Sequence, residues 1–368
     1  MRAVSSYAPV VALALIVMVP SVALAQTPDP SPSRATCVSR DSLAASNVTL
    51  AGPDSPTQRL TGRARISLDA SALRLDGGGF NTYSVAASAV PMLGEHLQIG
   101  VAPSYERFDG TQYTSQNVAT GVIANYVFGG DARWRGYVGG YGSFAAQTNA
   151  PGTRVAGAQG GALFFITPAV ALRSELRYRE NTSPNEQRYG SVVALITLDP
   201  YVSGSANEVT PGTPGIGVFD LAVLAFHEQY SSYHESGISG TIAPYLTRWA
   251  QVGAEGEAEH FSDLGGLTYY RLRGFGRGYV PLTTRTQPFV EGFAETSTEG
   301  GSDGGLTDYG AALGVREMLN GNVALDFGLR RTLRPTDTVA IGGRSFSVRF
   351  PASAALFAGV VTRLGRAR

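Results

Sequence analysis

The most informative run in the chain reads Val170-Ala171-Leu172-Arg173-Ser174-Glu175-Leu176-Arg177-Tyr178-Arg179. From Leu172 onward its even-numbered positions are apolar or small, whereas every odd-numbered position carries a charge. Successive side chains of a strand point to opposite faces, so this period of two indicates a strand with one apolar and one ionic face. The runs at 97–106 and 323–330 alternate with the same period, as do nearly all segments after position 61. The sequence therefore predicts an all-β fold.

The sequence also repeats itself at a distance of 153 positions. Pro91 matches Pro244 and Gln98 matches Gln251, with no gap between these two matches. Further matches, two of them after one residue of slippage, are Leu68 with Leu221, Gly100 with Gly253, Glu106 with Glu259, Phe108 with Phe261, Gly121 with Gly274, Tyr126 with Tyr279, Val138 with Val290, Gly140 with Gly292, Gly157 with Gly310, Val170 with Val323 and Arg177 with Arg330. Self-similarity at a fixed period indicates a duplicated structural unit.

Alternation and turn residues predict about eight strands in each unit. In the first unit, at 61–198, we expect strands near 62–72, 80–91, 95–108, 116–128, 132–146, 153–166, 169–180 and 187–198. In the second, at 217–366, we expect them near 217–228, 233–246, 248–261, 267–281, 286–297, 306–317, 321–332 and 346–364. A junction rich in Pro and Gly, 199–216, separates the two units.

The connections between these strands alternate in length. Tight turns are expected at Leu93-Gly94, Gly129-Gly130 and Thr167-Pro168. Longer polar connections are expected at Asp109–Ser115, Gln147–Gly152 and Glu180–Glu186. This alternation is typical of up-and-down outer-membrane barrels, in which the short turns are periplasmic.

Residues 1–25 have the features of a secretory signal peptide. Arg2 precedes an apolar stretch at 10–19, and Ala23-Leu24-Ala25 supplies the small residues for cleavage before Gln26. The apolar stretch is shorter than the roughly 18 to 20 residues that a spanning helix needs. We therefore expect export by the Sec pathway, followed by a flexible periplasmic lead-in at 26–60 that is rich in Pro, Ser and Thr.

The composition excludes several classes of function. The 29 acidic residues balance 29 basic ones, which is not the charge of a nucleic-acid-binding protein. All basic residues are Arg, so a phosphate-binding loop that ends in Lys is excluded. Cys37 is the single cysteine, which excludes an intrachain disulfide and a metal site of several thiolates. We expect no cofactor and no nucleic-acid partner.

The ionic face of these strands distinguishes a membrane barrel from a soluble barrel or sandwich. A soluble barrel or sandwich points its apolar residues inward, whereas a membrane barrel turns them toward lipid and lines its lumen with polar groups. Charges recur through many long strands, which favours the membrane barrel over a soluble sheet with one wet face. The lumen-facing charged candidates are Arg173, Glu175, Arg177, Arg179, Glu255, Glu257, Glu259, Glu291, Glu295, Asp326 and Arg330. We predict a transmembrane antiparallel up-and-down β-barrel of about 16 strands. The sheet is expected to close on itself because lipid offers no hydrogen-bond partners, so every backbone group must pair within the sheet.

Several runs of the sequence resemble those of bacterial outer-membrane β-barrel proteins. The runs are Tyr137-Val138-Gly139-Gly140-Tyr141-Gly142, Ala171–Tyr178, Pro288-Phe289-Val290-Glu291-Gly292-Phe293 and Val323–Arg330. Each unit is similar to the eight-stranded barrels of the OmpA and opacity-protein type, and the resemblance covers residues 60–366. It implies location in the bacterial outer membrane, with membrane lipid and the barrel assembly machinery as partners. Members of the family usually end on an aromatic residue, whereas this chain ends Leu364-Gly365-Arg366-Ala367-Arg368.

Two arrangements of the repeat remain open. One barrel of sixteen strands encloses a water-filled channel, whereas eight strands leave an interior that side chains fill. The second unit is acidic and the first is rich in arginine, so the two would form opposed walls of one lumen. This asymmetry favours the single barrel, and with it a passive porin-like channel for small polar solutes. The acidic set is Glu255, Glu257, Glu259, Glu291 and Glu295, and the basic set is Arg133, Arg135, Arg173, Arg177 and Arg179. The long junction and inward aromatic residues favour two tandem eight-stranded barrels and a non-conducting structural or surface-binding protein.

Three of the four histidines, His227, His234 and His260, fall near strand ends on the expected extracellular rim. The carboxylates near them in the sequence are Glu228, Glu235, Glu259 and Asp263. Such a set is able to bind a metal ion, or to serve a barrel hydrolase that activates water with a His and a carboxylate. The matching positions of the first unit are Arg74, Asn81 and Arg107, so half of the protein lacks the set. We therefore expect a solvated polar rim, with no catalytic residue and no metal ligand.

Overall fold

The computed structural model describes residues 60–75, 80–110, 114–129, 133–148, 150–182, 188–203, 214–230, 234–262, 267–280, 282–299, 306–333, 336–341, 344–349 and 352–365. The expected signal peptide, nearly all of the lead-in and most of the 199–216 junction lie outside these ranges. Within the described residues all regular structure is β-strand, and no helix is long and apolar enough to cross a membrane.

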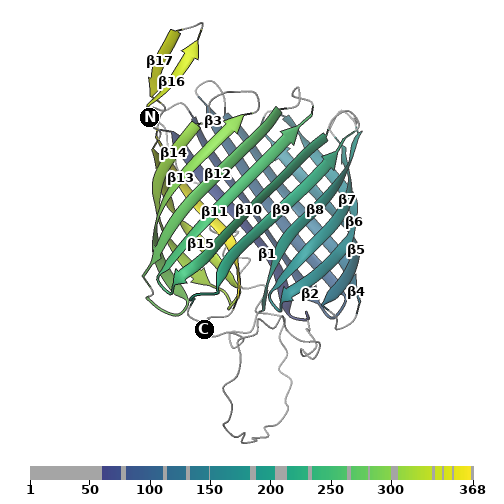
Figure 1. Cartoon of the computed structure of the whole chain (residues 1–368). Coiled ribbons are helices and arrows are strands. Elements are labelled where there is room, and N and C mark those ends of the chain that lie inside the picture. The colour runs from purple at the N-terminus through teal and green to yellow at the C-terminus, as the bar shows by residue number, and fades with distance from the viewer. Residues whose placement is uncertain are drawn as a thin grey trace, which may run out of the picture.

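Sixteen strands form one closed antiparallel barrel (Figure 1). The first eight are β1 (Arg63–Leu75), β2 (Phe80–Leu93), β3 (Leu97–Gly110), β4 (Thr114–Phe128), β5 (Trp134–Gln147), β6 (Ala150–Thr167), β7 (Val170–Thr182) and β8 (Arg188–Ser203). The other eight are β9 (Phe219–Gln229), β10 (His234–Thr247), β11 (Ala250–Phe261), β12 (Leu267–Tyr279), β13 (Thr286–Glu299), β14 (Leu306–Met318), β15 (Val323–Leu333) and β18 (Ser353–Leu364). The predicted all-β sixteen-stranded barrel is confirmed.

Two short strands lie outside the barrel. β16 (Thr336–Ile341) and β17 (Arg344–Arg349) pair only with each other among the described residues, and the hairpin stands above one rim (Figure 1). The sequence analysis missed this hairpin and merged β17 with β18 into one strand at 346–364. Pro351 lies between them, and proline has no N–H to donate to a strand ladder. Strand structure also takes up most of the expected long connection at Gln147–Gly152, since β5 and β6 pair as far as Gln147 with Ala150.

Alternation along each strand gives the barrel an apolar outside and a polar inside. On β7, Leu176 and Tyr178 are 63% and 51% exposed, whereas Arg173 and Glu175 are 8% and 4% exposed. Other outward residues more than half exposed include Val122, Tyr126, Val138, Ile238, Ile242, Tyr270, Leu272, Val290, Leu313 and Leu356. A soluble monomer rarely leaves so much contiguous apolar surface uncovered.

The sheet closes differently at its two ends. Near the hairpin, β8 pairs with β9 from Val192–Gln229 to Thr197–Leu224, and β1 pairs with β18 from Leu75–Ser353 to Asp69–Gly359. At the opposite end the partners are exchanged. There β1 pairs with β8 over Arg63–Arg65, and β9 pairs with β18 over Phe219–Leu221.

This exchange divides one end of the barrel in two. We call β1–β8 the first half, and β9–β15 with β18 the second half. At the hairpin end the two halves form one sheet of sixteen strands, whereas at the split end, where β1 begins and β18 ends, each half closes on itself. The alternative of two eight-stranded barrels therefore holds only at the split end.

An apolar seam joins the halves at the split end. Val170 and Leu198 of the first half are buried in one cluster with Val323 and Leu364 of the second. Ile66, Leu172, Val202, Phe219, Leu221, Val223 and Val360 pack against this cluster. The seam residues of β7 and β15 stand at positions whose side chains point out of the barrel. Each half therefore buries part of its outer surface against the other half.

Candidate functional site

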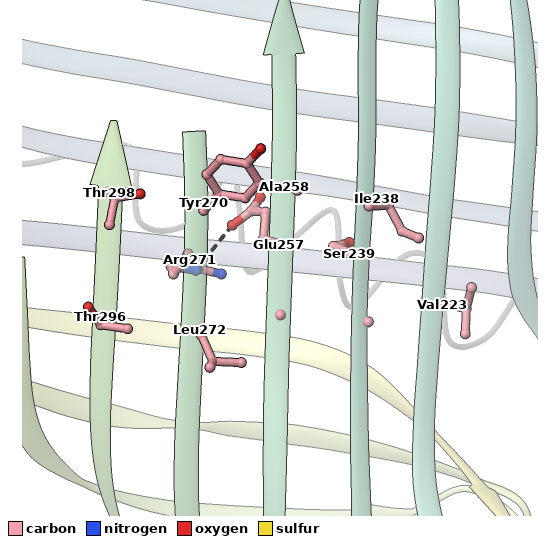
Figure 2. Close-up of a pocket in the computed structure, with 12 residues that line it drawn as sticks. Val223, Ile238, Ser239, Glu257, Ala258, Tyr270, Arg271, Leu272, Thr296 and Thr298 are labelled. Atoms are coloured by element: carbon pink, nitrogen blue, oxygen red, sulfur yellow. Dashed lines mark ion pairs between the residues drawn. The ribbon is translucent and has the colours of Figure 1, made fainter. Parts of the chain in front are cut away.

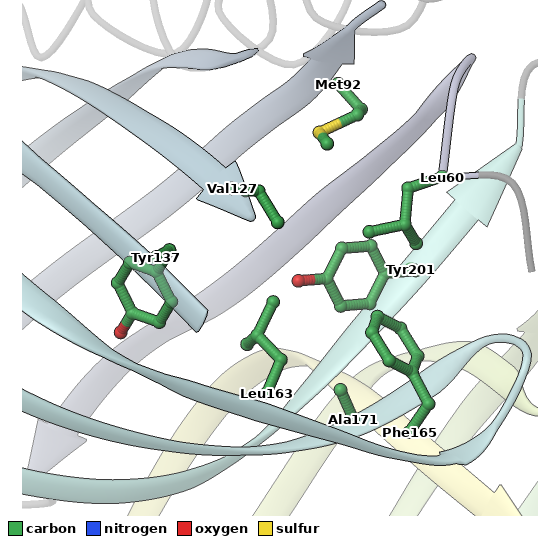
Figure 3. Close-up of a cluster of buried hydrophobic side chains, with 8 residues drawn as sticks. All are labelled: Leu60, Met92, Val127, Tyr137, Leu163, Phe165, Ala171 and Tyr201. Atoms are coloured by element: carbon green, nitrogen blue, oxygen red, sulfur yellow. The ribbon is translucent and has the colours of Figure 1, made fainter. Parts of the chain in front are cut away.

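The interior of the first half is filled by side chains at the split end. Eight residues, contributed by the segment before β1 and by six strands, form a buried cluster: Leu60, Met92, Val127, Tyr137, Leu163, Phe165, Ala171 and Tyr201. Figure 3 shows these side chains converging on one another. None is more than 3% exposed. We call this cluster the first plug.

A layer of paired charges lies directly above the first plug. Tyr137 donates its hydroxyl hydrogen to Glu175 at 2.6 Å, so the plug and the charged layer are joined. Arg173 and Arg177 both contact Glu175, at 2.8 and 2.6 Å. Asp199 accepts from Arg173 at 2.7 Å and from Arg65 at 3.2 Å. Every carboxylate of this layer is therefore neutralised by arginine.

The second half is filled in the same way but with more charge. Val218, Tyr245, Tyr279 and Phe289 form its buried apolar cluster, the second plug. Arg316, which is 1% exposed, reaches from β14 to Asp220 on β9 and to Asp326 on β15, each at 2.6 Å. It also donates to the Tyr245 hydroxyl at 2.6 Å. Because β14 and β9 are not neighbouring strands, this contact crosses the interior of the half.

A second charged layer continues toward the hairpin end. Arg277 pairs with Glu291 and with Asp326, each at 2.6 Å, and its guanidinium lies 4.2 Å from the centre of the Phe289 ring. Arg273 contacts Glu291 and lies over the Phe293 ring. Stacking of arginine on aromatic faces adds to the ion pairs in a site that excludes water.

The exposure of the charged side chains rises toward the hairpin end. On β12 the Arg277 and Arg273 side chains are 10% and 4% exposed, whereas Arg271, nearer the hairpin end, is 32% exposed. On β7 the value rises from 10% at Arg173 to 28% at Arg179. The interior side chains are thus more accessible to solvent at the hairpin end, which we call the vestibule, and are packed into two floors at the split end.

The expected opposed walls of acid and arginine are not formed. Glu255 and Glu257 pair with Arg271 on the adjacent strand at 2.7 and 3.1 Å, and Glu291 pairs with Arg277 within the same half. Neighbouring strands bring opposite charges close enough to pair locally, so these three carboxylates are not arranged against the arginines of the first half.

The other predicted lumen residues also stand at positions whose side chains point into the barrel. Arg179 contacts Glu228 across the junction of β7, β8 and β9, and donates to the Tyr230 hydroxyl at 3.0 Å. Arg330 lies over the rings of Phe293 and Phe357. Glu259 and Glu295 are half-buried and have no ion-pair partner among the described residues.

The three rim histidines lie outside the barrel. Their neighbouring ring centres are 5.8 Å apart, from His227 to His234 and from His234 to His260, so they form a row across β9, β10 and β11. His227 and His260 hydrogen-bond through Nδ1 to Ser236 and Thr268. In the described part of the chain, no group of three or more His, Cys, Asp or Glu residues is placed to hold a metal ion.

Several buried polar residues were not among the predicted site residues. Asp220, Arg316 and Arg363 are central to the second half, and Asp199 lies in β8 although the sequence analysis assigned it to the junction. One signal was available: Gln98 and Gln251 match in the repeat, and they are 2% and 1% exposed. Apart from such matched polar pairs, the only sequence signal that these side chains point inward is their odd or even position along the strand.

No family model matches the sequence, and no curated protein matches it. Similar solved structures include a bacterial polysaccharide outer membrane secretin, with 10% identity, a TM-score of 0.44, and coverage of 84% of this chain and 99% of that one. CdiB from Acinetobacter baumannii also has 10% identity and a TM-score of 0.44, over 83% of this chain and 60% of that one. The CymD monoaromatic hydrocarbon channel has 8% identity and a TM-score of 0.37, over 85% and 90%.

Proposed function

We propose that the chain is an integral β-barrel of the bacterial outer membrane. Support comes from the outward apolar residues on every side of a closed sheet, combined with an interior of paired charges. Lipid tolerates this arrangement because the closed sheet leaves few backbone groups unpaired. The signal-peptide features of residues 1–25 agree with export, and the split end is then periplasmic.

The barrel is proposed to be a vestibule that opens outward and is closed toward the periplasm. The observation that carries this proposal is the pairing of β1 with β8 and of β9 with β18, which narrows the split end to two eight-stranded rings. Side chains fill rings of that size. Both plugs are buried, so the resting protein is a non-conducting structural or surface-binding barrel.

A second candidate is passive passage of small polar solutes after a plug is displaced. Arg330 favours it, because this inward guanidinium has no ion-pair partner among the described residues and borders the solvated vestibule. A polar solute would find an unneutralised hydrogen-bond donor there. The resting geometry supports the closed barrel better.

We further infer that the chain is not an enzyme. The row of histidines faces outward, and the rings of His227 and His260 hydrogen-bond through Nδ1 to hydroxyls and not to carboxylates. The repeat supports descent of the two halves from one duplicated eight-stranded unit. Membrane lipid and the barrel assembly machinery are the proposed partners.

Planar-bilayer recording tests the closed barrel directly. The purified chain, inserted from detergent at high load, is expected to leave the bilayer sealed at low voltage. Steady channels with ohmic conductance in the unmodified protein would contradict the closed barrel and support the passage of solutes. Protease protection of vesicle-inserted protein reports membrane insertion separately.

A further inference from the structure

The outer surface of the second half has a groove that no part of the proposed vestibule uses. It has a volume of about 520 Å³ and its lining is mainly apolar. Gly240 and Gly256 form its floor, and Ile238, Tyr270 and Leu272 form its walls. Figure 2 shows Leu272 and Ile238 on either side of the strand that carries Ala258, and an ion pair between Arg271 and Glu257 joins the strands of Leu272 and Ala258. The groove exists because glycine has no side chain to fill it.

The row of histidines lies on the same outward face, nearer the hairpin end. On β10, Gly240, Ile238, Ser236 and His234 are successive outward positions, each about 7 Å from the next. Ser236 pairs in register with His227 on one side and with His260 on the other. The floor of the groove therefore leads along β10 to a cluster of imidazoles and hydroxyls.

The polarity of the outward residues changes where groove and histidines meet. Toward the split end the outward residues of β10 and β12 are apolar, and Ile242 and Leu272 are 54% and 59% exposed. Toward the hairpin end they become Ser236, His234 and Thr268, with the half-exposed Tyr270 at the change. Aromatic residues mark the border between the apolar band of a membrane barrel and the headgroup region. The groove is thus at acyl-chain depth and the histidine row at headgroup depth.

We propose that this face binds one membrane lipid with a phosphorylated headgroup. An acyl chain lies over Gly240 and Gly256, and the phosphate accepts hydrogen bonds from the imidazoles of His227 and His260. Nδ1 of both rings is already bonded to a hydroxyl, which leaves Nε2 for the phosphate. This inference rests on the proposed membrane location.

Native mass spectrometry of the full chain in detergent tests the site with three probes. Dioleoyl phosphatidic acid and dioleoyl phosphatidylglycerol carry the phosphate, whereas dioleoylglycerol has the same acyl chains without it; equal retention of the two phosphorylated lipids excludes a role for the glycerol of phosphatidylglycerol. We expect the unmodified protein to retain phosphatidylglycerol about tenfold better than dioleoylglycerol, the equivalent of about 1.4 kcal/mol for a charge-assisted hydrogen bond. Equal retention of phosphatidylglycerol and dioleoylglycerol would overturn the proposal.

Two variants and two matched controls separate the parts of the site. His227→Ala combined with His260→Ala should lower retention of phosphatidylglycerol to the level of dioleoylglycerol, whereas His96→Gln at the split end should not. Gly256→Leu should lower retention of both lipids, because a leucine there fills the groove and its Cβ meets only Leu272, at 3.9 Å. Gly276→Leu, also outward and with nothing within 4 Å of its Cβ, is the control.

The outcomes also separate this site from the membrane proposal. Retention that is unchanged in both variants, or lowered equally in the controls, would overturn the lipid site. Vesicle insertion of the same proteins, followed by protease protection, reports the membrane location independently. A protein that inserts fully without preferring the phosphorylated lipid contradicts only the lipid site.

Discussion

Arg316 on β14 donates to Asp220 on β9 at 2.6 Å, across the interior of the second half. The same guanidinium bonds to Asp326 through two nitrogens, at 2.6 and 2.7 Å. One buried side chain thus ties β14 to β9, a strand with which β14 shares no backbone hydrogen bonds. Each charge in this floor has a partner of opposite sign. Loss of one partner leaves the other charge buried and unpaired, which is strongly unfavourable.

Replacing Arg316 with Ala should therefore destabilise the barrel strongly. Removal of one partner from a buried ion pair typically costs about 3–5 kcal/mol. Arg271→Ala is the matched control, because its ion pairs with Glu255 and Glu257 are a quarter to a third exposed and are worth at most about 1 kcal/mol. Urea unfolding of vesicle-inserted protein measures both, and equal losses would show that Arg316 is not buried as described.

Removing either plug should open one of two separate passages. Tyr137→Ala with Phe165→Ala removes two of the eight side chains of the first plug, and Tyr279→Ala with Phe289→Ala removes two of the four side chains of the second. Since each eight-stranded ring is filled only by its own side chains, each pair of changes should produce single-channel conductance in planar bilayers. The variant with all four changes should conduct with the sum of the two values. A first-plug variant that already reaches the full combined conductance would argue for one undivided lumen.

Gly314 should not tolerate a side chain. A Cβ there would lie 2.4 Å from the Phe289 ring and 2.7 Å from the Phe327 carbonyl oxygen, so the second plug would have to shift. Overpacking of this kind costs about 1–3 kcal/mol. Gly292→Ala is the control, since nothing lies within 4 Å of its Cβ. Urea midpoints of the two variants are expected to differ by this amount, and matching midpoints would refute the tight packing.

Much of the fold was predictable from the period of two. Each of the sixteen expected strands overlaps a barrel strand, and residues such as Leu97 and Ile99 are outward while Gln98 is buried. Parity is a local property, so it is visible in the sequence. The same reasoning placed Arg173 and Glu175 on the inner face.

The exchange of strand partners was not predictable. Arg65 and Asp69 belong to one strand, yet Arg65 pairs with β8 and Asp69 with β18. The alternation of polar and apolar residues does not distinguish Arg65 from Asp69. Which strand each of them pairs with is decided by the packing between the two halves. The apolar residues of the seam, such as Val323, have the same pattern as residues that face outward. Sequence reasoning therefore posed one barrel or two as alternatives, whereas the structure combines them.

Disulfide trapping tests the split barrel most directly. In a Cys37→Ser background, Ala64→Cys with Val202→Cys probes the pairing of β1 with β8, and Ala70→Cys with Ala358→Cys probes the pairing of β1 with β18. Cross-strand Cα atoms about 4.5–5.5 Å apart suit a disulfide. Ala64→Cys with Ala358→Cys, which are not in register, is the negative control.

We predict that the four-cysteine protein forms both disulfides in one folded molecule, as detected by mass spectrometry of the proteolysed barrel. Formation of only the 70–358 bond would indicate a sixteen-stranded barrel along its whole length. Formation of only the 64–202 bond would indicate two independent barrels. Either result would contradict a sheet that is single at the hairpin end and divided at the split end.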